Sequence, residues 1–165
     1  MTTAVVVGNP KPASRTLSAA TYLAERLSGH APELVVDLAT LGTSILDWAD
    51  ERVASLVEQV GKADLVVVAS PTYKATYTGL LKLFLDRFAG GTGLSGIAVP
   101  FMLGGSPAHA LAPELSLRPV LTEIGGTVVG QGLYVVDSRH DDPAAYSEWL
   151  RATAPTISTL LKAAS

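Results

Sequence analysis

Polar side chains able to hold an anion gather in the segment that follows the first apolar run of the sequence. Residues 8–18 read Gly-Asn-Pro-Lys-Pro-Ala-Ser-Arg-Thr-Leu-Ser, and Ser14 has the residue type of a helix N-cap. Arg15, Thr16 and Leu17 would then present free backbone N–H groups, which suit a phosphate at a helix N-terminus. The segment lacks G-x-G-x-x-G and G-x-x-x-x-G-K-[ST], so it fits a phosphomonoester better than a dinucleotide or a triphosphate. An ordinary capped helix with a solvated Arg15 explains the segment at least as well.

A second polar segment, residues 70–79, combines a proline with two tyrosines. Pro71 stiffens the end of an apolar run, and the residues beyond it supply backbone amides and the rings of Tyr73 and Tyr77. A flavin needs such a platform, with an aromatic or apolar cover and N–H donors toward the ring edge that becomes anionic on reduction. The alternative is that both tyrosines pack against helices and Lys74 is solvated. We favour flavin binding, because this segment is more specific than the first.

A third segment, Gly-Gly-Ser-Pro-Ala-His at residues 104–109, follows a later apolar run. Paired Gly104 and Gly105 allow a backbone to approach a planar ligand closely. His109 has the residue type of a base, but a single histidine at a helix start is more often structural or exposed to solvent. Hydride transfer to a flavin needs no protein acid or base, because the cofactor carries the chemistry. We therefore assign no catalytic residue.

Composition excludes several other kinds of site. With no cysteine among 165 residues, the chain has no thiolate nucleophile, thiolate zinc site or iron–sulfur cluster. Asp141 and Asp142 read as a solvated loop, so we predict no metal site. A formal net charge of -3 argues against a nucleic-acid partner. The sequence shows neither a secretory signal nor an apolar stretch near the ~20 residues of a membrane span, so we expect a cytoplasmic protein.

The elements that must position these segments alternate along the chain. Strand-like apolar runs cover Ala4–Val7, Leu34–Val36, Leu65–Ala69, Ile97–Leu103 and Thr127–Val136, and several lack the alternation of a half-exposed strand. Helical patterns cover Leu17–Leu27, Val53–Val60, Leu80–Phe88, Ala108–Ile124 and about Ala144–Ala164, with a kink or break expected at Pro155. This alternation predicts one α/β domain over residues 1–165 with a doubly wound parallel sheet. Ligands bind such sheets beyond the carboxyl ends of the strands, where all three polar segments fall.

Taken together, the segments resemble the NAD(P)H-dependent FMN reductase family of flavodoxin-like proteins. The resemblance covers Val5 to about Tyr134 and rests on residues 8–16, 70–86 and 104–111; the Tyr-Lys-Ala-x-Tyr-x-Gly pattern in the second is the most specific. Leu117–Leu121 also looks like this family. The reductase components of alkanesulfonate-type two-component monooxygenases are closest in appearance.

The resemblance implies a flavodoxin-like sheet of five parallel strands in the order 2-1-3-4-5, with helices on both faces. It implies FMN and NAD(P)H as cofactors, hydride transfer from nicotinamide C4 to flavin N5, and delivery of reduced FMN to a flavin-dependent monooxygenase. It also implies a homodimer or homotetramer that buries the helix after residue 79. The implied cofactor-binding residues are Asn9, Ser14, Arg15 and Thr16 around the phosphate, Pro71, Thr72, Tyr73 and Lys74 along the ribityl chain and ring, and Gly104, Gly105 and Ser106 at the other ring edge.

Two departures from the family pattern leave alternatives open. Asn9 stands where serine is common, and Leu115 stands near the place where some of these reductases carry an aromatic residue or histidine in a π-bulge. The alternatives are a quinone, azo or metal-ion reductase that retains FMN, a non-enzymatic flavodoxin-type electron carrier, and a flavin-free structural domain. The sequence does not distinguish NADH from NADPH.

Overall fold

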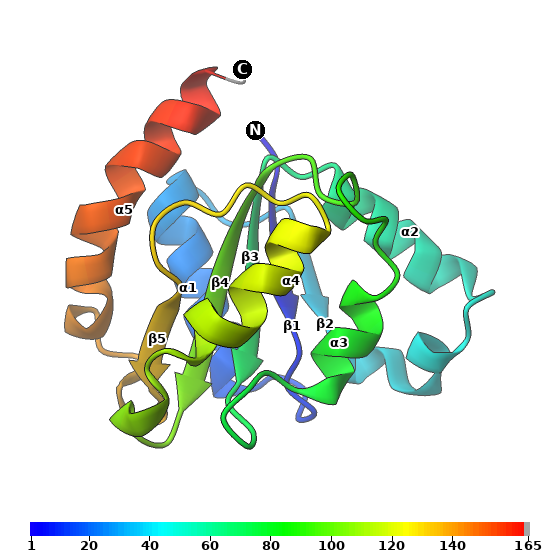
Figure 1. The fold of residues 1–165 in the computed structure, drawn as a ribbon, viewed down its shortest axis with the longest axis horizontal. Coiled ribbons are helices and arrows are strands. Elements are labelled where there is room, and N and C mark those ends of the chain that lie inside the picture. Colours follow the sequence, from blue (N-terminus) through cyan, green and yellow to red (C-terminus); the bar gives the residue numbers. More distant parts are fainter. Residues whose placement is uncertain (164–165) are drawn as a thin grey trace.

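Five parallel strands in the order β2-β1-β3-β4-β5 lie at the centre of the chain (Figure 1). This computed structural model describes residues 1–163. The strands are β1 (Thr3–Val7), β2 (Leu34–Asp37), β3 (Leu65–Pro71), β4 (Ile97–Gly104) and β5 (Leu133–Val136). The predicted sheet and strand order are confirmed.

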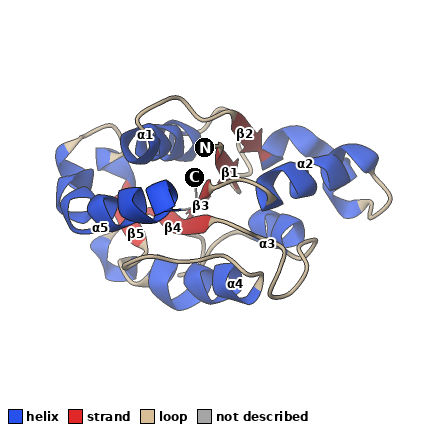
Figure 2. Cartoon of the chain, turned by 90° about the horizontal axis from the view of Figure 1, so that it is seen from above, coloured by secondary structure: helices blue, strands red, loops and turns tan. Residues whose placement is uncertain are grey.

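Helices cover both faces of the sheet, as Figure 2 shows from above. The helices are α1 (Arg15–Ser28), α2 (Glu51–Gly61), α3 (Gly79–Leu85), α4 (Arg118–Glu123) and α5 (Ala144–Ala163). Short 3-10 turns cover Leu38–Leu46, Pro107–His109 and Asp137–Arg139, and a π-helical turn covers Pro113–Leu117. No helix in residues 1–163 is both long and apolar enough to cross a membrane.

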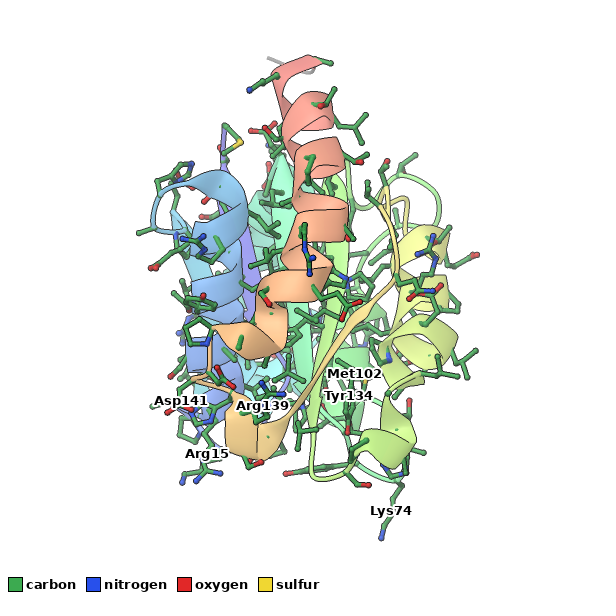
Figure 3. The ribbon with its side chains drawn as sticks, turned by 90° about the vertical axis from the view of Figure 1, so that its left-hand side faces the viewer. Arg15, Lys74, Met102, Tyr134, Arg139 and Asp141 are labelled. Atoms are coloured by element: carbon green, nitrogen blue, oxygen red, sulfur yellow. The ribbon has the colours of Figure 1, made fainter. Side chains whose placement is uncertain are left out.

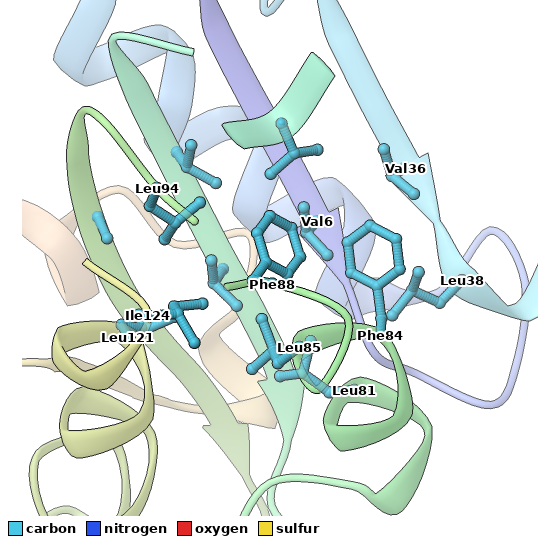
Figure 4. Close-up of a cluster of buried hydrophobic side chains, with 14 of the residues drawn as sticks. Val6, Val36, Leu38, Leu81, Phe84, Leu85, Phe88, Leu94, Leu121 and Ile124 are labelled. Atoms are coloured by element: carbon cyan, nitrogen blue, oxygen red, sulfur yellow. The ribbon is translucent and has the colours of Figure 1, made fainter. Parts of the chain in front are cut away.

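Each face of the sheet has its own hydrophobic cluster. Val5 and Val7 pack on the side of α1 and α5, whereas Val6 packs on the side of α2, α3 and α4. In the cluster on the side of α2, α3 and α4, shown in Figure 4, the rings of Phe84 and Phe88 meet edge to face with centroids 5.4 Å apart. Burial on both faces explains why the strands read as continuous apolar runs.

Four expected boundaries differ from the structure. The helical pattern expected over Ala108–Ile124 is α-helical only as α4, after a 3-10 turn and a π-helical turn. Strand β5 begins only at Leu133; Thr127 makes a single bridge to Ile97, and Gly130 then turns the chain with φ 68°. Helix α3 ends at Leu85, so Phe88 is buried from the following turn. Helix α5 continues through Pro155 without a break. The expected end of that helix at Ala164 lies outside the described residues.

A buried junction joins the ends of β1 and β3 to the start of α3. Thr78 Oγ1 donates to the Gly8 carbonyl (2.5 Å) and accepts from the Leu81 N–H (3.1 Å), while the Thr78 N–H donates to Ser70 Oγ (3.0 Å). A Cβ on Gly8 would lie 2.4 Å from the Leu81 Cβ, so only glycine fits there. One hydroxyl therefore fixes the first polar loop to the second.

Replacing Thr78 with valine should weaken this junction. The isosteric change removes the N-cap of α3 and leaves the Gly8 carbonyl buried without a donor. We expect Thr78→Val to lower the free energy of unfolding by about 1–3 kcal/mol in denaturant titrations. Thr78→Ser keeps the hydroxyl and should retain most of that stability. Equal losses in both variants would contradict a role for the hydroxyl.

Candidate functional site

The start of α1 presents unpaired backbone donors at the carboxyl edge of the sheet. Ser14 caps the helix, because its Oγ accepts from the Leu17 N–H at 3.3 Å. The prediction that the Leu17 N–H would be free is therefore wrong. The N–H groups of Arg15 and Thr16, by contrast, find no acceptor among residues 1–163. This end of the helix retains two donors and a partial positive charge for an anion.

The loop before α1 is held by side chains at both of its ends. Asn9 donates from Nδ2 to Thr16 Oγ1 (3.0 Å) and accepts at Oδ1 from the Lys11 N–H (2.9 Å). Asp37, at the end of β2, accepts from the Ala13 N–H at 2.9 Å. Asn9 thus braces the loop internally instead of supplying the hydroxyl of the serine common at its position.

The loop after β3 makes a tight reverse turn. Tyr73 and Thr76 exchange backbone hydrogen bonds of 2.8 and 3.2 Å, while Lys74 and Ala75 between them adopt φ of 53° and 67°. The N–H groups of Lys74 and Ala75 meet no acceptor in the described chain. Tyr73 is 53% exposed, whereas Tyr77 packs against the core. The turn therefore presents one aromatic ring and two amide donors to solvent, and the second tyrosine is structural.

Tyr134 of β5 supports the third loop from beneath. Its hydroxyl donates to the Ser106 carbonyl at 2.6 Å, and a Cβ on Gly104 would lie only 1.9 Å from that hydroxyl. Burial raises the pKa of the Tyr134 phenol above its ordinary value, so the hydroxyl stays a donor at neutral pH. Gly104 thus makes room for a tyrosine of the protein itself, which sequence reasoning missed.

The buried Thr72 Oγ1 lies next to this support. It lies near the Tyr134 hydroxyl and works to lower the pKa of that phenol, but it makes no hydrogen bond of good geometry. The Thr72 N–H donates to the Leu103 carbonyl at 2.7 Å, which fixes the residue between β3 and β4. The Thr72 hydroxyl therefore has no partner in the described chain other than its neighbour Tyr134, which leaves it able to bind a further group.

The tip of the third loop is open. A Cβ on Gly105 would meet nothing within 4 Å, and Ser106 Oγ accepts from the Ala108 N–H at 3.2 Å. His109 follows in an exposed turn, where its ring makes no hydrogen bond or ion pair with the described residues.

Asp137, in the loop after β5, forms an ion pair with Arg15 at the start of α1. Arg15 Nη1 lies 2.6 Å from Asp137 Oδ2, with side chains 63% and 40% exposed. Arg139, two residues on, pairs with Asp142 at 2.6 Å. Figure 3 shows Arg15, Arg139 and Asp141 near this end of the molecule and Lys74 projecting from the loop after β3. Asp137 was also missed, although it directly follows a strand that ends at the same edge.

The π-helical turn lies beside this edge. It covers Pro113–Leu117, and Leu115 within it is 72% exposed. Glu114 accepts from the Gly132 N–H at 2.8 Å and so ties the turn to the segment just before β5. Leu115, which the sequence placed near the π-bulge of some related reductases, therefore lies in π-helical geometry.

The assembled edge suits an anionic group joined to a flat ring. It offers amides at the start of α1, an exposed tyrosine with further amides at the second loop, and an unpartnered hydroxyl at Thr72. No group of three or more His, Asp or Glu residues in the described range could hold a metal ion. Two of the larger hollows, of about 490 and 510 Å³, lie elsewhere, between α3 and α4 and along β5 and α5. A smaller hollow of about 210 Å³ lies at this edge beside the first turn of α1, lined by Ser18, Tyr22, His140 and Asp141.

Comparisons with known proteins agree with this chemistry. A family model described as NADPH-dependent FMN reductase matches residues 1–141. An FMN reductase (NADPH) of Escherichia coli strain K12 is 29% identical, over 81% of this chain and 72% of that protein. The NADH-dependent FMN reductase SfnF of Pseudomonas fluorescens is also 29% identical, over 90% of this chain and 88% of that protein. The crystal structure of the apo form of an NADH:FMN oxidoreductase (EMOB) superposes with a TM-score of 0.81 at 31% identity, covering 98% of this chain and 89% of that one.

Removing the Tyr134 hydroxyl should loosen the third loop. Tyr134→Phe deletes the donor to the Ser106 carbonyl and should lower the free energy of unfolding by about 0.5–1.5 kcal/mol. Hydrogen exchange of the amides in residues 104–108 should become faster. Tyr22→Phe is the matched control, because the Tyr22 hydroxyl makes no hydrogen bond with the described residues. Unchanged exchange in Tyr134→Phe would refute the support.

Proposed function

The chain belongs to the NADPH-dependent FMN reductase family, oxidoreductases that use NAD(P)H and FMN, and we propose that it supplies reduced FMN to a partner flavin-dependent monooxygenase. The observation that carries the proposal is the set of unpaired backbone donors at the carboxyl edge of the sheet, on loops whose Arg15, Tyr73 and Lys74 are exposed. Donors on exposed loops let flavin enter and leave. Relatives named for NADH and for NADPH both occur, so both nucleotides are proposed substrates.

We propose that the FMN phosphate binds at the start of α1. The free N–H groups of Arg15 and Thr16 would donate to the phosphate at the positive end of the helix dipole. The Arg15 guanidinium would add a full positive charge. Ser14 and Asn9 hold this arrangement, Ser14 as the helix cap and Asn9 through Thr16 Oγ1. Ser14 and Asn9 therefore shape the proposed phosphate site through contacts within the protein, and their side-chain atoms in those contacts are not free to bind the phosphate.

The other two loops are proposed to border the ribityl chain and the ring. Pro71 and Thr72 lie at the end of β3, where the unpartnered Thr72 hydroxyl can bind a ligand hydroxyl. Tyr73 and Lys74 supply an aromatic cover and an amide donor, and the segment Gly104, Gly105 and Ser106 lines the opposite edge. Bound FMN supplies the hydride acceptor, and the amide donors favour charge that develops on its ring. The protein's contribution is thus binding and orientation.

We also propose a homodimer or homotetramer that buries α3. The groove between α3 and α4 is lined in part by Leu85, Phe88 and Val120, and Lys82 pairs across one helical turn with Asp86 at 2.5 Å. Leu83 in α3 and Leu115 in the π-helical turn just before α4 add exposed apolar side chains. A cytoplasmic location is proposed because NAD(P)H is supplied there.

Steady-state kinetics test the fate of the flavin. If FMN is a dissociating substrate, initial rates with FMN and NADH, or with FMN and NADPH, should follow a sequential pattern, and gel filtration should strip the flavin from the protein. A ping-pong pattern with flavin retained through gel filtration, and a quinone or azo dye as second substrate, would instead establish the reductase that retains FMN.

The phosphate assignment has its own test. Arg15→Gln removes the only charge proposed to meet the phosphate directly, so the Kd for FMN should rise about three- to tenfold. Riboflavin, which has no phosphate, is the matched control ligand, and its Kd should not change. An equal change for both flavins, or no change for FMN, would contradict this placement of the phosphate.

A further inference from the structure

Arg15, the cation proposed to meet the FMN phosphate, already has an anionic partner within the protein. Its Nη1 lies 2.6 Å from Asp137 Oδ2. The two residues come from opposite ends of the chain, one from the start of α1 and the other from the turn after β5. The pair therefore forms only because the fold brings both segments to the carboxyl edge of the sheet.

A carboxylate in this place opposes a phosphate in two ways. It occupies donors of the guanidinium that the phosphate would use, and it adds a negative charge beside a dianion. The surrounding segment strengthens the second effect, because residues 137–142 contain three aspartates and one arginine, a formal charge of -2 with histidine neutral. That arginine, Arg139, is itself engaged by Asp142.

A second carboxylate acts on the same loop from the other side. Asp37 Oδ2 accepts from the Ala13 N–H at 2.9 Å, so this amide is not available to an anion. The Leu17 N–H is likewise taken by Ser14. The start of α1 thus keeps only part of the donor set that its sequence offers.

We propose that Asp137 competes with the FMN phosphate for Arg15 and so sets the affinity for FMN low enough for the flavin to exchange. This inference rests on the proposed function, in which FMN leaves after reduction. The pair is exposed enough for Arg15 to change partners, since exposed ion pairs hold each other weakly. Asp137 is therefore a residue that tunes cofactor affinity, distinct from those that hold the phosphate.

The test is the affinity of the apoprotein for FMN, riboflavin and inorganic phosphate in variants of this pair. Asp137→Asn keeps the shape of the side chain and should lower the Kd for FMN about two- to fivefold, with riboflavin unchanged. Inorganic phosphate should also raise the melting temperature of Asp137→Asn more than that of the parent. Asp141→Asn is the matched control, because it makes the same charge change in the same loop on a side chain that does not contact Arg15.

The double variant separates competition from simple repulsion. If Asp137 acts through Arg15, the gain in FMN affinity should largely disappear when Asp137→Asn is made in the Arg15→Gln background. A Kd for FMN that is unchanged or higher in Asp137→Asn overturns the inference, as does an equal gain in Asp141→Asn. Should Arg15→Gln alone leave FMN binding unchanged, the phosphate placement fails too; a loss in Arg15→Gln without a gain in Asp137→Asn refutes only the competition.

Discussion

The hydrogen bond from Thr78 to the Gly8 carbonyl is the contact on which the geometry of the site depends. It joins the loop after β1 to the loop after β3 across a sequence separation of 70 residues. The same hydroxyl caps α3, so the helix, the end of β1 and the loop that follows it are fixed relative to one another. Gly8 is required because Leu81 packs where its side chain would be. A change in this small buried junction would therefore move two ligand loops at once.

The loop after β4 is held from β5. Tyr134 reaches under Gly104 to the Ser106 carbonyl, and Glu114 ties the π-helical turn to the segment before β5. These contacts come from β5 and the residue just before it, and β5 is an edge strand paired with β4. The loops after β1 and β3 thus have their support in the centre of the sheet, whereas the loop after β4 depends on the sheet's edge. Flexibility at the edge would reach the loop after β4 first.

The sequence predicted the sheet, and placed the proposed site at one edge of it, from strong local signals. Continuous apolar strands require cover on both faces, and the strand ends of a parallel sheet meet at one edge. The Ser14 cap and the Tyr73 turn could be located for the same reason, since residue type determines them. Boundaries that depend on tertiary packing were missed. Gly130 and the contact between Gly132 and Pro113 delay β5, and surrounding structure carries α5 through Pro155.

Two residues of the candidate site could not be predicted from the sequence, and both for the same reason. Tyr134 and Asp137 act on loops more than 20 residues away, Tyr134 by filling space below Gly104 and Asp137 by pairing with Arg15. No spacing rule connects such partners. Their proposed effects on ligand binding are opposite in sign, because Tyr134 holds the loop after β4 and Asp137 pairs with Arg15. The donors of the proposed phosphate site can be read from the sequence, but which of them remain available depends on contacts that only the folded chain makes.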